Sequence, residues 1–387
     1  MESIFRYELI IIGGGISACV FASNYLQNNP RSKIALIEAG RSLGGRSSTR
    51  ISRSFRGWEL NHGSPNINIF NSKKNLLLQN YIDHLLENKF IKNDDSEYVQ
   101  IYKKLNLDII NNFQFLNGHN YISLFSMSEL SQNIIGFKNL RNQIDFYFNT
   151  LIFDLCFDNN EWNLTSKNGY KFKSNYLICS SNLLLHKRSL KILGTNEIPL
   201  RKAIPANKNK KIDSLLNLLN QQIFIPRLTF MIYTTQNYSY RDFYTKKYRY
   251  CYLDKVLENK YEFERVIFQR QNMDRLGIVI HTRSKNLIDS YLNEKNEIIF
   301  KQKIIRRFNS LFENNSSINY LIGNENISIM KWRASQPSGV AIPLHLQFCR
   351  INRIGFCGDW FDGEGFGRIE GAILSALMLA EKFKTLN

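Results

Sequence analysis

Gly13, Gly15 and Ala18 follow the apolar run Leu9 to Ile12, and Glu38 stands twenty residues after Ala18. These residue types at this spacing can bind the pyrophosphate and ribose of a dinucleotide. Gly13 permits a tight turn, Gly15 lets the backbone approach the phosphates, and Ala18 allows a helix to pack closely. Glu38 would accept hydrogen bonds from ribose hydroxyls.

A strand, a helix and a second strand must position these residues. Leu9 to Ile12 predicts the first strand, Ser17 to Leu26 predicts the helix, and Ile34 to Ile37 predicts the second strand. The phosphates would lie at the positive N-terminus of the helix. Glycines at such a turn also occur for purely structural reasons, but strand, helix, strand and acid agree here. The pattern predicts a dinucleotide site that NAD or FAD would fill.

A second glycine-rich group lies near the C-terminus. Gly358 follows a short strand that begins at Arg353, and an apolar helix is predicted from Ile373 to Phe383. Gly358 can lie close to a phosphate, and Asp359 can hydrogen-bond a ribityl hydroxyl. The helix N-terminus, near Ile369 to Ala372, would direct its dipole at the flavin edge where negative charge collects on reduction. Eight of the 21 glycines lie in residues 1–63 and seven in residues 339–387, so we expect both ends to build one site.

The composition is that of a soluble globular protein. With 387 residues, 43% hydrophobic and 22% charged, the chain is long enough for two domains. The first strand starts by about Tyr7, and no apolar run reaches the roughly 18 residues of a membrane span, so we expect a cytoplasmic protein without a signal peptide. The six cysteines are scattered, so disulfides, structural zinc and a dithiol centre are not expected.

The net charge of +18 raises the question of a nucleic-acid or membrane partner. The positive residues are spread along the whole chain, which we interpret as a composition bias. The best local candidate is Tyr238 to Tyr252, where bases alternate with aromatics as in single-strand-binding surfaces. The same alternation fits a half-solvated strand pair, which we favour. We expect no nucleic-acid partner and no membrane span.

The sequence predicts two different sets of helices and strands in the middle of the chain, here called the first and second textures. The first contains helices at 74–86 and 127–136 (capped by Ser126 or Ser128), strands at 144–148 and 150–157, a hairpin around Asn168-Gly169, and a strand at 176–179 that returns to the nucleotide-binding sheet. The second contains strands at 222–234, 248–253, 264–270 and 276–282 and helices at 285–296 and 297–312. The second texture predicts a mostly antiparallel sheet with a covering layer.

The motifs Gly13-x-Gly15-x-x-Ala18, Glu38, Gly44-Gly45-Arg46, Asn61-His62-Gly63-Ser64, Lys331-Trp332-Arg333, Gly358-Asp359-Trp360 and Arg368-Ile369-Glu370-Gly371-Ala372 occur together in this chain. This combination resembles the renalase-like branch of the flavin amine oxidase superfamily. The resemblance implies an α/β fold: a glutathione-reductase-like FAD/NAD(P)-binding Rossmann domain with an inserted α+β substrate domain on a mostly antiparallel sheet. The FAD-binding domain would comprise residues 1–70, 140–182 and 331–387, and the substrate domain residues 71–139 and 183–330.

The resemblance also implies FAD held noncovalently, with a small-molecule substrate above its ring between the two domains. Arg46 would contact the pyrophosphate, and the backbone around Ile152 would face the adenine. Asn61 and Pro65 stand where the family often has an acid and a glutamine, and Cys357 lies in no covalent attachment motif. The predicted cofactor-binding residues are Gly13, Gly15, Ala18, Glu38, Ala39, Gly45, Arg46, Ile152, Gly358, Asp359, Ile369, Glu370 and Ala372.

The resemblance implies an oxidase that accepts a hydride at flavin N5 from a dihydronicotinamide-type donor, including isomeric NAD(P)H, and passes electrons to O2. Near the ring we predict His62 as a hydrogen-bonding group and Trp332 and Trp360 as walls, whereas His281 is expected in the core. One alternative is an amine oxidase or carotenoid-type desaturase of the same superfamily, although the sequence assigns no aromatic cage and carboxylate for an amine. Another is a non-catalytic FAD-fold protein that binds a partner.

Overall fold

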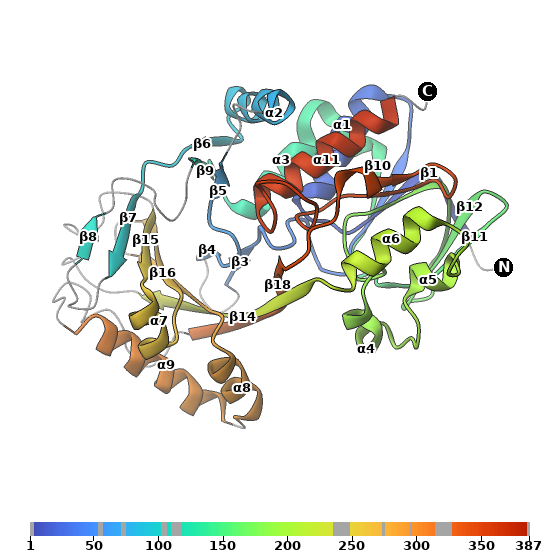
Figure 1. Ribbon diagram of the computed structural model, residues 1–387. Helices are drawn as coiled ribbons and strands as arrows, with labels where there is room; N and C mark the ends of the chain where they lie inside the picture. Colours follow the sequence, from blue (N-terminus) through green and yellow to red (C-terminus); the bar gives the residue numbers. More distant parts are fainter. Residues whose placement is uncertain are drawn as a thin grey trace.

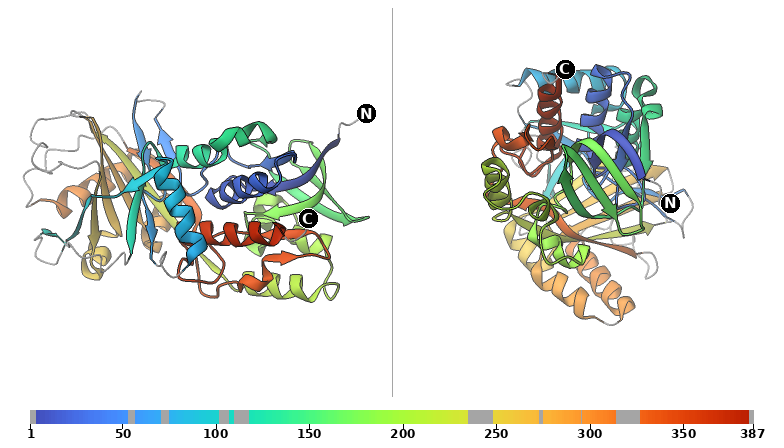
Figure 2. Two further views of the ribbon diagram at one scale, coloured as in Figure 1. Left: turned by 90° about the horizontal axis from the view of Figure 1, so that it is seen from above. Right: turned by 90° about the vertical axis from the view of Figure 1, so that its right-hand side faces the viewer.

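The computed structural model describes residues 4–52, 57–70, 75–101, 107–109, 118–234, 248–272, 275–294, 296–313 and 327–384. It has two parts, each built on one large sheet, and the long strands β14 (Ile223–Thr234) and β18 (Ile327–Ser338) lie between them (Figure 1). The molecule is elongated along the line that joins the two parts, and both termini lie at the same end (Figure 2). Most of the basic and aromatic stretch at 238–252 lies outside the described residues.

The first part is an eight-stranded sheet centred on β1 (Ile4–Ile12). Strands β1, β2 (Ile34–Ile37), β10 (Ile144–Tyr147), β13 (Lys171–Cys179) and β20 (Ile354–Phe356) are parallel, and β11 (Ile152–Asp158), β12 (Glu161–Ser166) and β19 (Phe348–Cys349) add antiparallel pairs. The apolar runs at the ends of β1 and β2 are buried, as parallel strands covered on both faces require. The predicted hairpin at Asn168-Gly169 is confirmed, because β12 and β13 form an antiparallel pair on either side of it. The predicted return of residues 176–179 to this sheet is also confirmed, because the end of β13 pairs with β1.

Helices cover both faces of this sheet. On one face α1 (Ile16–Asn28), α2 (Leu76–Glu87), α3 (Met127–Gly136) and α11 (Ile369–Lys384) share one core cluster (Figure 1). On the other face lie α4 (Leu190–Leu193), α5 (Pro199–Ala203) and α6 (Lys210–Leu219). The predicted boundaries place 71–139 and 183–330 in the substrate domain, whereas α2 to α6, which lie within them, share core clusters with the nucleotide-binding sheet.

The second part is a seven-stranded sheet in the order β18, β14, β17, β16, β15, β7, β8. Its further strands are β7 (Glu97–Ile101), β8 (Leu107–Ile109), β15 (Tyr248–Leu253), β16 (Arg265–Asn272) and β17 (Arg275–Thr282). The pairs are antiparallel except β15 with β7. One face is covered by α7 (Lys255–Tyr261), α8 (Lys285–Asn293) and α9 (Glu297–Leu311), which confirms the predicted covering layer.

Two small sheets connect the large ones. Strands β3 (Thr49–Ile51) and β4 (Glu59–Asn61) form one, and β5 (Ile67–Ile69), β9 (His119–Ser123) and β6 (Ile91–Asn93) form the other. Leu60 packs on the face of the seven-stranded sheet that α7 to α9 leave open. A Cβ at Gly277 would lie 2.0 Å from Leu60 Cδ2, so a glycine there lets β4 approach the sheet. This packing places the residues after β4 between the two parts.

Candidate functional site

The glycine loop at the end of β1 is crowded at every position except Gly15. A Cβ at Gly13 would lie 3.1 Å from Ser181 Cβ, and one at Gly45 would lie 3.2 Å from Gly15 Cα. A Cβ at Gly15 would meet no described atom within 4 Å. Helix α1 begins here without an acid in its first turn or a described side chain that caps it. Ala18 is fully buried, which allows α1 to pack closely. Because no described atom fills the space at Gly15, the first backbone amides of α1 face an open space, as an anion site requires.

The Glu38 carboxylate is fixed by backbone amides. Its Oε2 accepts a hydrogen bond from Gly14 N at 2.6 Å, and its Oε1 accepts one from Gly40 N at 2.5 Å. Ala39 lies between these contacts, beside the glycine loop. Because a carboxylate oxygen has two lone pairs, both oxygens can still accept from a ribose hydroxyl. Glu38 therefore also clamps the loop, a role that spacing alone did not reveal.

Arg46 and Asp359 bind each other. The guanidinium donates from Nη1 to Asp359 Oδ2 and from Nη2 to Asp359 Oδ1, both at 2.7 Å, and Nη1 also donates to the carbonyl oxygen of Ser335 at 3.0 Å. The Asp359 side chain is 6% exposed, and the Arg46 side chain, including its aliphatic stem, is 42% exposed. The sequence predicted separate cofactor contacts for these two residues and missed their pair. Nε of Arg46 is not used in these three bonds, so it can still donate to a phosphate.

The C-terminal glycines allow two close approaches. A Cβ at Gly358 would lie 2.1 Å from Trp360 Nε1, and a Cβ at Gly365 would lie 2.3 Å from Gly371 N. The second contact folds the loop over the start of α11, which begins at Ile369, where the helix N-terminus was predicted. Glu370 and Ala372 in that first turn are buried, and Glu370 Oε2 accepts from Phe70 N at 3.1 Å. Glu370 thus has a structural contact that the sequence did not predict.

Two predicted site residues lie in the core. Trp360 is 2% exposed and packs against Phe356 and Phe361, so the structure corrects its assignment as a pocket wall. The side chain of Ile152 is also 2% exposed and belongs to the same core cluster. Ile152 can therefore face a ligand through its backbone only, which is the part named in the prediction. Cys357 is fully buried, as a packing residue is.

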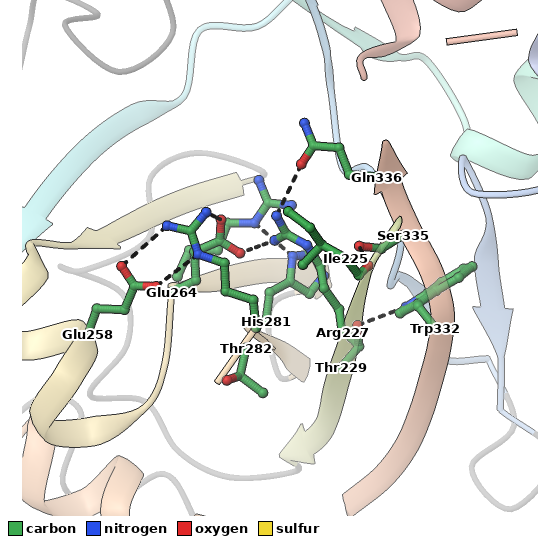
Figure 3. A network of polar contacts seen from close by, with 12 residues as sticks. Ile225, Arg227, Thr229, Glu258, Glu264, His281, Thr282, Trp332, Ser335 and Gln336 are labelled. Atoms are coloured by element: carbon green, nitrogen blue, oxygen red, sulfur yellow. Dashed lines mark hydrogen bonds and ion pairs between the residues drawn. The ribbon is translucent and has the colours of Figure 1, made fainter. Parts of the chain in front are cut away.

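His62 and Trp332 stack where the two parts meet. Their ring centroids are 5.3 Å apart and the ring planes differ by 26°. Trp332 Nε1 donates to Thr229 Oγ1 at 3.0 Å, which fixes the indole against β14 (Figure 3). Burial and the nearby charge of Arg50 lower the pKa of His62 to about 4, so its ring is neutral at pH 7. Its Nδ1 is buried and has no described hydrogen-bond partner.

His281 connects His62 to Arg265. Arg265 Nε lies 2.7 Å from His281 Nδ1, and His281 Nε2 lies 3.0 Å from the carbonyl oxygen of His62. A guanidinium can only donate, so His281 Nδ1 accepts the hydrogen bond from Arg265. His281 Nε2 is therefore protonated and donates to the backbone carbonyl oxygen of His62. Burial, together with Arg265 and Arg227, lowers the pKa of His281 well below its ordinary value. His281 is 3% exposed, which confirms the expected core position.

Charged side chains at this end of the seven-stranded sheet form a network (Figure 3). Arg227 pairs with Glu264 and donates to Gln336 Oε1 at 3.2 Å. Arg283 Nε lies 3.0 Å from Glu258 Oε1. No signal in the sequence marks these arginines, because an arginine in an alternating strand usually lies on a solvated face.

Asn61 has a structural role that explains why an amide suffices where an acid was expected. Its Oδ1 accepts from Thr49 Oγ1 at 2.6 Å and from Met127 N at 3.2 Å, which ties β3 and the start of α3 to β4. Gln269 binds the backbone of Asn61 in both directions, at 2.9 and 2.8 Å. The described contacts of Oδ1 need only an acceptor, so they do not require a charge. Pro65 is buried nearby in the chain.

Comparisons with known proteins establish the fold. Residues 11–85 match an NAD(P)-binding Rossmann-like domain. Cyclohexylamine oxidase from Brevibacterium oxydans IH-35A superposes with a TM-score of 0.66 at 11% identity over 98% of this chain and 99% of that one. A putative protoporphyrinogen oxidase from Exiguobacterium sp. 255-15 gives 0.65 at 10% identity over both full chains, and putrescine oxidase bound to putrescine gives 0.62 at 11% identity over 99% and 100%. No curated protein sequence matches the chain significantly.

The chain therefore has a Rossmann-like α/β fold with a second, mostly antiparallel sheet, which is the fold of these oxidases. This result confirms the predicted fold class. Within the described residues, no helix has both the length and the apolar character of a membrane span. Among the same residues, no group of three or more His, Cys, Asp or Glu side chains is arranged to hold a metal ion.

Proposed function

We propose that this protein is an FAD-dependent oxidoreductase of the flavin amine oxidase superfamily. The observation that carries the proposal is the space at Gly15, which no described atom fills and which lies at a helix start without a described side-chain cap. The Arg46–Asp359 pair joins this region to the C-terminal segment. We assign the eight-stranded part to the cofactor and the open face of the seven-stranded sheet to a small-molecule substrate.

The residues present fit FAD. The amides at the start of α1 would hold the pyrophosphate, with the exposed side of Arg46 as its counter-charge. Glu38 would accept from the ribose, and the backbone around Ile152 would face the adenine. The remaining predicted contacts are Gly13, Ala18, Ala39, Gly45, Gly358, Asp359 and the start of α11 at Ile369, Glu370 and Ala372. When bound, FAD would supply hydride acceptance at N5 and electron transfer to O2.

The chain's own residues would position the substrate. Trp332, held by Thr229, and the neutral ring of His62 form a rigid stacked pair that fits one side of a planar donor. With a pKa of about 4, His62 can exchange one hydrogen bond with a substrate at neutral pH without bringing a charge. We propose a renalase-like donor, a dihydronicotinamide or one of its isomers. The second candidate is an amine, which the names of two structurally similar oxidases support.

Anaerobic mixing tests the donor. The purified protein, loaded with FAD, would be mixed with NADH, NADPH, their dihydropyridine isomers and a panel of amines, and flavin bleaching would be recorded. We expect bleaching by at least one dihydronicotinamide. Bleaching by amines alone would overturn the donor we propose and support the second candidate. If the protein binds FAD and no donor bleaches it, the non-catalytic alternative gains support.

A further inference from the structure

The end of the seven-stranded sheet beside His62 carries an excess of positive charge. Three arginines meet there, and two of them have acidic partners: Arg227 pairs with Glu264, and Arg283 pairs with Glu258. Arg265 is half-buried and makes no ion pair with a described residue. Its described partners are neutral, so one positive charge in this cluster is left without a counter-charge.

Arg265 lies on the sheet face that meets the first part of the molecule. Two and four residues further along β16, Ile267 packs in the cluster that includes Leu60, and Gln269 binds the backbone of Asn61. Because side chains alternate along a strand, Arg265 shares this face. His281 contacts both Arg265 and His62, so a single side chain separates Arg265 from His62. Arg265 therefore borders the space that we assign to the substrate.

The neighbours of Arg265 cannot supply the missing negative charge. His281 accepts from Arg265 Nε as a neutral ring, and burial raises the pKa of the Tyr252 hydroxyl, its other hydrogen-bonding neighbour, so Tyr252 stays a neutral phenol. Two acids, Glu264 and Asp94, influence Tyr252. Glu264 pairs with Arg227, and neither acid forms an ion pair with Arg265 among the described residues. A partly buried charge without a counter-ion is unfavourable, and a bound anion would relieve this cost.

We infer that Arg265 is an oxyanion-binding residue of the substrate site and that the donor carries a phosphate or a carboxylate. The inference rests on the proposed function, since it assumes that the donor lies over this face. A guanidinium has five N–H donors. Arg265 commits Nε to His281 and hydrogen-bonds Tyr252, so three donors remain for an oxyanion. A cationic amine such as putrescine would meet the uncompensated charge of Arg265 and would be repelled.

Two donors that differ only by a phosphate test the inference. Dihydronicotinamide mononucleotide and dihydronicotinamide riboside share one reactive ring, and each would be mixed anaerobically with the FAD-loaded protein. We expect kcat/KM to be about 10- to 100-fold higher for the mononucleotide, the range of one hydrogen-bonded charge. Arg265→Gln should abolish that preference, because it removes the charge that binds the phosphate. Arg306→Gln removes one charge from the exposed side of α9 and should keep the preference.

Binding without reaction separates the two sources of the oxyanion. Ligand-observed NMR would compare ribose 5-phosphate with ribose, and benzoate with benzamide. A preference for either anion that Arg265→Gln removes and Arg265→Lys partly keeps supports the inference and identifies the anion. Equal binding within both pairs, or a preference that survives in Arg265→Gln, would overturn it. If no dihydronicotinamide reduces the flavin, the proposed donor fails, and these titrations still decide the anion site.

Discussion

Replacing Gly15 with valine should abolish FAD binding and leave the fold intact. Gly15 has φ −73° and ψ 174°, which any residue adopts, and its Cβ direction is open for 4 Å among the described atoms. The valine therefore meets no described protein atom near its Cβ, and the loss of chain freedom in the unfolded state changes stability by less than about 1 kcal/mol. The side chain would instead fill the space where the phosphates approach the α1 amides.

The size of the effect follows from the contacts that are lost. Displacing the pyrophosphate from two amides removes two charge-assisted hydrogen bonds, together about 3 to 6 kcal/mol. This loss corresponds to a rise in the FAD Kd of roughly 10² to 10⁴-fold. Gly136→Val is the matched control, because a Cβ at Gly136 also meets no described atom within 4 Å and Gly136 ends α3 on the helical surface. Calorimetric titration with FAD measures the Kd of both variants, and their melting temperatures show whether each variant is folded. Wild-type affinity in a folded Gly15→Val protein would refute our placement of the phosphates.

Three further predictions concern stability and side-chain roles. Arg46→Met leaves the buried Asp359 carboxylate unpaired and should lower the free energy of unfolding by about 2 kcal/mol, a value discounted for the exposure of the Arg46 side chain. Denaturant unfolding of the double variant Arg46→Met/Asp359→Asn should show that the second change restores part of this loss. The pKa of His62 is lower folded (about 4) than unfolded (ordinarily 6.5), so the unfolded state binds the extra proton and stability falls as the pH drops from about 6.5 to 4, by about 3 kcal/mol in all. His62→Phe should keep the stack on Trp332 and make the free energy of unfolding fall less steeply as the pH drops across that window, while His281 and His186 keep their own contributions; an unchanged slope would contradict the buried neutral ring. Trp360→Phe should lower the melting temperature without changing KM for the donor, and a KM change without destabilisation would return Trp360 to the substrate site.

The parts of the fold that local rules determine were predictable. The β1–α1–β2 unit follows from two apolar runs, Leu9 to Ile12 and Ile34 to Ile37, and from the glycine turn after the first. Helix α3 follows from its capping box, in which Ser126 Oγ accepts from Glu129 N and Glu129 Oε2 accepts from Ser126 N. Each of these signals lies within a few residues, so the sequence displays it directly.

The parts that depend on distant pairing were not predictable. Strand β18 lacks a regular alternation of polar and apolar residues, and its register with β14 shifts between Ile225 and Arg227, so no period-two pattern marks it. The Arg46–Asp359 pair joins residues 313 positions apart. In the sequence, Arg265 has the pattern of a solvated strand residue. Only the folded structure places it beside His281 and close to His62. These are the features that shape the candidate site.

The most direct test of the central claim is a titration of the purified protein with FAD, followed by its visible spectrum. The proposed function predicts one FAD bound per chain, a perturbed flavin absorption band, and release of intact FAD on denaturation. A folded protein that neither contains FAD nor takes it up would contradict the assignment of the Gly15 space, the Glu38 carboxylate and the Arg46–Asp359 pair to a cofactor.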